Sequence, residues 1–308
     1  MAALIGDVKR FLEAVERLDR EMSRAILKAV QTIRRSVDVN ALTDALTSGG
    51  MNEALALLQI NKAHLYPIEA AVQNSFVAGG ELIAVGVPVR AGVLGFDGRS
   101  IRAERWVKGE SSRLIQDITN KHIEMTRTIL QKQLQAGRAP RSAALDMAGR
   151  INRATGQREG GYIGLNRKQA EYIDNAIDDL RELNPRYLNR KLRDPRFDDL
   201  FKAARVSGKP LTETQVQTIA QRYRDATVKY RAETIARTES ITALRAGRRE
   251  GMEQAVEQNI IRDDRITRVW DATGDSRTRP DHMAMDGRKI EGLTDPWVMP
   301  NDDLMMFP

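Results

Sequence analysis

The spacing of the apolar side chains constrains the fold of this chain more than any other feature. From Asp7 to Arg35 they recur at steps of three and four residues, which places them on one face of a helix. These positions are Phe11, Leu12, Val15, Leu18, Met22, Ile26, Leu27, Val30 and Ile33. Similar patterns return at 51–59, 111–135, 168–183, 212–231 and 230–257. We therefore predict a mainly α protein with a multi-helix N-terminal and central body.

One segment near the carboxyl end departs from the helical period. Side chains from Ile266 to Trp270 alternate between two faces and are rich in β-branched residues, which is typical of a strand. A short helix is predicted to begin at Thr278, a candidate N-cap, with Pro280 in its first turn. Gly287 stands where a left-handed C-terminal cap belongs, and residues 288–290 can form a return strand. The segment predicts a small α+β module with a short β-hairpin-like element.

These patterns divide the 308 residues into three predicted parts. Residues 1–98 form an N-terminal helical region, and residues 99–228 form a central helical body with a basic segment. Residues 229–308 form the C-terminal module together with the helix that precedes it.

Positive charge is concentrated in the middle of the chain. Residues 181–250 carry 17 Lys and Arg against 9 Asp and Glu, whereas residues 251–308 carry 7 against 12. A basic stripe of this kind suits non-specific binding to DNA phosphates, although it is also typical of a solvated helix face or of a face covered by the acidic end. The predicted nucleic-acid-binding residues are Arg186, Arg190, Lys191, Arg193 and Arg196.

The predicted helix at 230–257 carries a stripe of small residues. They are Ala232, Ala236, Ala243, Gly247 and Gly251, at steps of four, seven, four and four residues. Side chains this small let another backbone come close to the helix.

Residues 270–290, WDATGDSRTRPDHMAMDGRKI, combine Trp, Arg, Asp and His at high density. A calcium loop is excluded because its sixth position is Ser276 rather than Gly and the bidentate Glu is missing. A hydrolytic or nuclease site would use His282 with Asp275 or Asp286.

The third interpretation of this stretch is structural, and the residues by themselves favour it. Arg277 and Arg279 would bind carboxylates as planar forks, His282 would hydrogen-bond Asp286, and Trp270 would cover them. We call this arrangement the polar clasp. It is predicted to pin the module onto the small-residue face of the preceding helix.

Composition narrows the remaining classes of function. The chain has no cysteine, which excludes disulfides, thiolate zinc sites and a cysteine nucleophile. Charges at Asp7, Lys9 and Arg10 argue against a signal peptide. The most apolar stretch, 76–96, contains Glu81, Pro88 and Arg90, so no membrane span is expected. No cofactor and no metal are predicted.

Two stretches together resemble a known family. ETIARTESITALRAG at 233–247, followed by VWDATGDSRTRPDHMAMDG at 269–287, resembles the phage head morphogenesis family, the minor capsid proteins typified by phage Mu protein F. The matching positions are Ala236, Arg237, Thr238, Glu239, Trp270, Asp275, Arg277, Thr278, Arg279, His282, Asp286 and Gly287. With further similar segments upstream, the resemblance covers roughly residues 100–308. Many members end in a short cysteine-bearing segment, which this chain lacks.

The resemblance implies a virion protein present in few copies rather than an enzyme. It implies a place inside the head near the portal vertex, and the host cytoplasm during assembly. The implied partners are the portal protein and the major capsid or scaffolding protein, with packaged DNA as a further partner and ejection with the DNA as a possible fate. Two alternatives are an ejected nuclease or cell-wall hydrolase that uses His282 and its Asp neighbours, and a structural adaptor without DNA contact.

Overall fold

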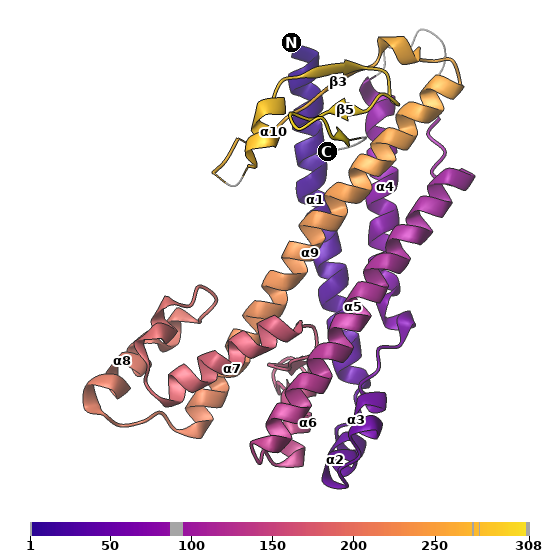
Figure 1. Ribbon diagram of the computed structural model, residues 1–308. Helices are drawn as coiled ribbons and strands as arrows, with labels where there is room; N and C mark the ends of the chain where they lie inside the picture. The colour runs from indigo at the N-terminus through magenta and orange to yellow at the C-terminus, as the bar shows by residue number, and fades with distance from the viewer. Residues whose placement is uncertain (1, 87–94, 273, 277, 306–308) are drawn as a thin grey trace. The chain divides into compact units, whose positions relative to one another are not determined.

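The computed structural model describes residues 2–86, 95–272, 274–276 and 278–305 (Figure 1). The prediction of a mainly α protein is confirmed, and the strands are short antiparallel pairs. The helices are α1 (Ala2–Ser36), α2 (Val39–Thr47), α3 (Met51–Leu57), α4 (Tyr66–Gly86), α5 (Ile101–Gln135), α6 (Pro140–Ala148), α7 (Arg167–Arg181), α8 (Asp198–Ser207), α9 (Glu213–Glu257) and α10 (Pro280–Met285). The strands are β1 (Arg150–Ile151), β2 (Arg158–Glu159), β3 (Thr267–Val269), β4 (Lys289–Glu291), β5 (Trp297–Val298) and β6 (Leu304–Met305).

The chain forms two compact units, and helices α1, α4, α5 and α9 each contribute to both. The larger unit contains residues 12–74 and 106–242. The smaller unit contains residues 1–11, 75–105 and 243–308. The predicted division into 1–98, 99–228 and 229–308 remains a prediction.

In the larger unit, the glycine-rich loop between α6 and α7 is held by a buried arginine. Arg34 on α1 donates from Nη2 to the Gly161 carbonyl at 2.7 Å and from Nε to the Ile163 carbonyl at 3.2 Å. Its Nη1 reaches Asp225 on α9 at 3.1 Å. Asp225 in turn accepts hydrogen bonds from the Gly160 backbone N–H at 2.9 Å. One guanidinium thus ties α1, α9 and the loop together.

In the smaller unit, α4 and α9 approach each other through glycines. A Cβ added to Gly247 would lie 1.7 Å from the Phe76 carbonyl oxygen, and one added to Gly79 would lie 2.0 Å from the Leu244 carbonyl oxygen. At Gly251 the nearest atom would be the Gly80 carbonyl oxygen, at 3.0 Å. The prediction that the small-residue stripe admits another backbone is confirmed for its Gly247–Gly251 portion, and the backbone is that of α4.

This packing corrects the expectation that the C-terminal module sits on the small-residue face. At Gly247 and Gly251 that face is occupied by α4, because two helices bearing glycines at their crossing point can pack backbone against backbone. Beyond the crossing, Ile83 and Ala255 form a small buried cluster that Met252, Ile260 and Ile261 cover.

Candidate functional site

The C-terminal module has the order predicted from the sequence: strand, loop, short helix and strand. β3 pairs antiparallel with β4, with Arg268 opposite Ile290 and Val269 opposite Lys289, and α10 lies between them in the chain (Figure 1). Gly287 has the left-handed φ expected of it, +75°, but it is part of a turn rather than the predicted helix cap: Asp286 is extended (φ −53°, ψ 131°) and the Arg288 N–H donates to the Met285 carbonyl at 2.9 Å. The Gly287 N–H then donates to the Trp270 carbonyl at 2.9 Å, which closes the unit.

An apolar core that the sequence analysis missed holds the module together. Trp270, Met285, Trp297 and Met299 are all buried and pack against one another. The Trp270 and Trp297 rings meet edge to face with centroids 5.3 Å apart. Trp297 lies on a second hairpin, in which β5 pairs with β6, that was not predicted. The only sequence signal for it was a Trp within a short stretch bounded by Pro296 and Pro300.

His282 and Asp286 do not form the hydrogen bond expected for the polar clasp. The Asp286 carboxylate accepts from the Ala272 backbone N–H at 2.9 Å. The His282 ring instead packs edge-on against Trp270, with centroids 5.3 Å apart. The i and i+4 spacing places the two residues on one helix face, but the loop before α10 offers the carboxylate a nearer donor.

The loop before α10 is closed by Asp275 and Thr278. The Thr278 hydroxyl donates to the Asp275 carboxylate at 3.1 Å and accepts from the Asp275 N–H at 3.2 Å. Thr278 is therefore a turn residue. The N-cap of α10, which was predicted to be Thr278, is Arg279, and the Arg279 side chain makes no capping hydrogen bond. Arg277 lies outside the described residues. Among those described, Arg279 forms no ion pair, so the predicted Arg279–carboxylate fork is corrected too.

Arg268, which was not predicted, binds backbone carbonyls of the module through its guanidinium. Its Nε donates to the Gly292 carbonyl at 2.7 Å and its Nη2 donates to the Asp295 carbonyl. The guanidinium also lies over the Trp297 ring, 5.7 Å from the centroid. Burial lowers the pKa of Arg268, with Asp295 opposing the shift. An arginine bound to backbone carbonyls leaves no pattern of paired charges in the sequence, so spacing alone could not reveal it.

Residues 236–239, which we call the A-R-T-E run, belong to the larger unit, whereas residues 270–287 belong to the smaller one. Arg237 lies 3.5 Å from Asp19 on α1, and the Thr238 hydroxyl bonds the Thr234 carbonyl within the helix. Glu239 is buried and pairs with Arg113 on α5 at 2.8 Å.

Arg113 forms ion pairs with two carboxylates, because it also binds Glu110 at 2.5 Å. Burial raises the pKa of Glu239 and the Arg113 bond opposes the shift, whereas that same guanidinium lowers the pKa of Glu110. The A-R-T-E run therefore fastens α9 to α1 and α5.

Several arginines of the basic segment form ion pairs with nearby carboxylates. Arg190 is buried, binds Asp179 at 2.7 Å and stacks over Tyr172. Arg193 binds Asp198 at 2.8 Å.

Arg196 binds Asp194 at 2.6 Å, yet its side chain remains 75 % exposed. Arg186 and Lys191 are exposed. These three side chains are exposed to solvent, whereas Arg190 is committed to the packing of α7 against the segment that follows it.

Two further properties of the described residues concern metal binding and membrane spans. They contain no group of three or more His, Asp or Glu side chains placed to hold a metal ion. None of the helices within them is long and apolar enough to span a bilayer.

Comparison with known protein families finds a match over part of the chain. Residues 212–303, which contain all of α9 and the module through Asp303, match the family model described as Phage Mu protein F like protein. Over these residues the match confirms the resemblance to a phage head morphogenesis family, and the resemblance of residues 100–211 stays a prediction. No curated protein and no solved structure matches the chain.

Proposed function

We propose, from the premise that residues 212–303 are those of a phage Mu protein F-like protein, that this chain is a minor phage head protein. It binds the portal or the capsid interior during head assembly and contacts the packaged DNA. The family match carries the proposal. It is supported by the module itself, where the matched Trp270, Asp286 and Gly287 all have structural roles around one apolar core.

Localisation in particles tests the head function. We expect the chain in purified heads at few copies per particle, and we expect it to co-purify with the portal protein when both are expressed together. Comparing the amount of this chain in intact and in DNA-emptied particles distinguishes a protein that stays in the head from one that leaves with the DNA. Absence from intact particles, with no portal association, would overturn the proposal.

Contact with DNA is proposed through the exposed part of the basic segment. Arg186, Lys191 and Arg196 are exposed on a stretch that Arg190 and Arg193 hold in place, through a buried ion pair with Asp179 and a partly buried one with Asp198. Each phosphate that such a side chain neutralises releases counterions, so affinity falls as salt rises. The acidic composition of residues 251–308 supports a binding surface in the basic middle of the chain rather than in the module.

Replacing Arg186 and Lys191 together with Ser is expected to weaken duplex DNA binding at low salt without unfolding the chain. The slope of log K against log salt should become shallower by about 2, because two phosphate contacts are lost. Fluorescence anisotropy with labelled duplex DNA measures both quantities. Lys62→Ser, an exposed lysine elsewhere in the larger unit, should leave the slope unchanged. Binding that does not depend on salt, or that is unaffected by the double substitution, would contradict this assignment.

A further inference from the structure

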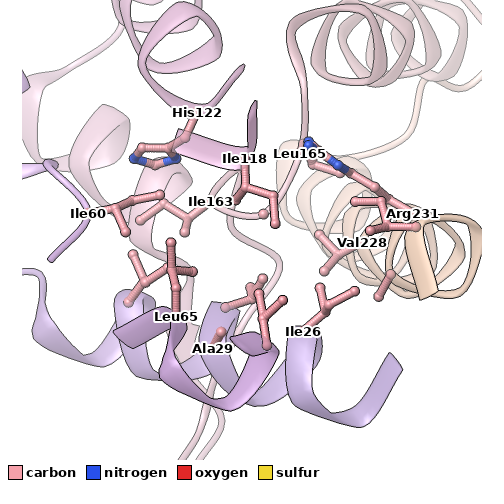
Figure 2. Close-up of a pocket in the computed structure, with 16 residues that line it drawn as sticks. Ile26, Ala29, Ile60, Leu65, Ile118, His122, Ile163, Leu165, Val228 and Arg231 are labelled. Carbon is pink, nitrogen blue, oxygen red and sulfur yellow. The ribbon is translucent and has the colours of Figure 1, made fainter. Parts of the chain in front are cut away.

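The larger unit contains a small, partly open apolar cavity with one charged side chain in its wall. The cavity measures about 30 Å³ and is bounded by α1, α5, α9 and the loop at 163–165 (Figure 2). Most of its lining side chains are aliphatic, including Ile26, Ile118 and Val228. The lining residues with polar side chains are His122 and Arg231. Figure 2 shows Arg231 entering from α9 and His122 from the α5 side.

Arg231 differs from the other buried arginines because it has no hydrogen-bond or ion-pair partner in the described part of the chain. Arg34 binds Asp225, Arg190 binds Asp179, and Arg224 donates to the Gly160 carbonyl at 3.2 Å and the Tyr162 hydroxyl at 3.3 Å. Arg231 is 8 % exposed, and among the described residues nothing accepts a hydrogen bond from it.

The surroundings of Arg231 do not neutralise its charge. Burial lowers the pKa of Arg231, and only Asp117 opposes this shift. Asp117 is itself bound to Lys121 at 2.7 Å.

His122 cannot supply the missing negative charge. Its Nε2 lies 2.8 Å from the Leu58 carbonyl, so this nitrogen is the donor. Burial lowers the pKa of His122 and the Arg231 charge lowers it further, which keeps the ring neutral near pH 7. The wall of the cavity therefore presents one positive charge and no negative charge.

An unpaired charge in an apolar environment destabilises the folded chain. A guanidinium cannot relieve this by losing its proton, because it stays protonated in proteins. The cavity is larger than the ~10–15 Å³ that one water needs, so a species of one to three non-hydrogen atoms fits beside Arg231. In such a low-dielectric site the attraction between unlike charges is stronger than in water.

We propose that this cavity binds one small monovalent anion, of the size class of chloride or formate, on the Arg231 guanidinium. The site is independent of the head function proposed above. The aliphatic walls exclude larger and multiply charged anions such as sulfate, because they offer no donors beyond Arg231. The bound anion neutralises Arg231 and so stabilises the packing of α9 against α1 and α5.

Thermal unfolding at constant ionic strength tests the proposal. Exchanging gluconate, which is too large for the cavity, for chloride or formate should raise the Tm of the full chain by about 4 °C at ~100 times the Kd. Sulfate should be compared at matched ionic strength and should not reproduce the rise beyond its general salting effect. In Arg231→Met the specific rise should vanish, and in gluconate this variant should be at least as stable as the native chain, because the unpaired charge is gone.

Arg245→Met is the matched control, since Arg245 is an exposed arginine on the same helix, and it should keep the full chloride response. If Arg231→Met does not fold, crystals of the native chain grown in bromide decide the question. An anomalous peak in the cavity beside the guanidinium supports the proposal. Ordered water at that position with no halide, or a native Tm that responds equally to gluconate and chloride, would overturn it.

Discussion

Gly247→Ala is expected to destabilise the smaller unit by about 3 kcal/mol or more, although it adds a single methyl group. The added Cβ would lie 1.7 Å from the carbonyl oxygen of Phe76 and 2.7 Å from its carbonyl carbon. Both atoms belong to helix backbone, so α4 and α9 would have to move apart. The separation would also open the approach of Gly79 to Leu244, where an added Cβ would lie 2.0 Å from the carbonyl oxygen.

Gly109→Ala is the matched control for this substitution. Gly109 also lies in a long helix, but a Cβ there meets nothing within 4 Å, so the change should stabilise the chain by about 0.5–1 kcal/mol through helix propensity. Urea or thermal unfolding followed by circular dichroism measures both variants. If Gly247→Ala were as stable as the native chain, the backbone contact between α4 and α9 would be refuted.

Arg34→Met is expected to cost about 3–5 kcal/mol in the larger unit, mainly because it leaves the carbonyls of Gly161 and Ile163 without their donor. It also removes the buried partner of Asp225, which is half-buried and keeps its hydrogen bonds from the Gly160 N–H. The damage should begin in the loop before α7. Hydrogen exchange at the amides of residues 158–163 should accelerate before global unfolding.

Arg35→Met separates this buried network from the general effect of losing a basic residue. Arg35 follows Arg34 on the same helix and is exposed, so its substitution should change stability by less than about 0.5 kcal/mol. Equal effects from the two substitutions would show that the contacts of Arg34 do not hold the loop.

The elements of the C-terminal module could be predicted because each depends on neighbours in sequence. Alternation at 266–270 indicated β3, and Pro280 indicated the first turn of α10. The positive φ of Gly287 followed from the absence of a Cβ. The contacts among these elements were predicted less well. His282 and Asp286 share a helix face, but a backbone N–H outside the helix binds the carboxylate.

The contacts of the basic segment also could not be predicted from the sequence. Net charge is a property of composition, so the sequence revealed the excess of arginine. Which arginines remain available depends on where acidic side chains fall in space. Arg190 and Arg196 look alike in the sequence, yet Arg190 is buried with Asp179 while Arg196 stays exposed beside Asp194.

The sequence by itself determined the helical class, the order of elements in the module and the match to the phage family, because periodicity, turn chemistry and motif order are written along the chain. It also located the small residues of α9, since a helix places every third or fourth residue on one face. Only the tertiary structure decided that α4 fills this face, that Trp297 completes the core of the module, and that Arg231 faces a cavity without a counter-charge. Each of these depends on residues far apart in sequence, whose approach is set by the packing of whole elements and leaves no local pattern.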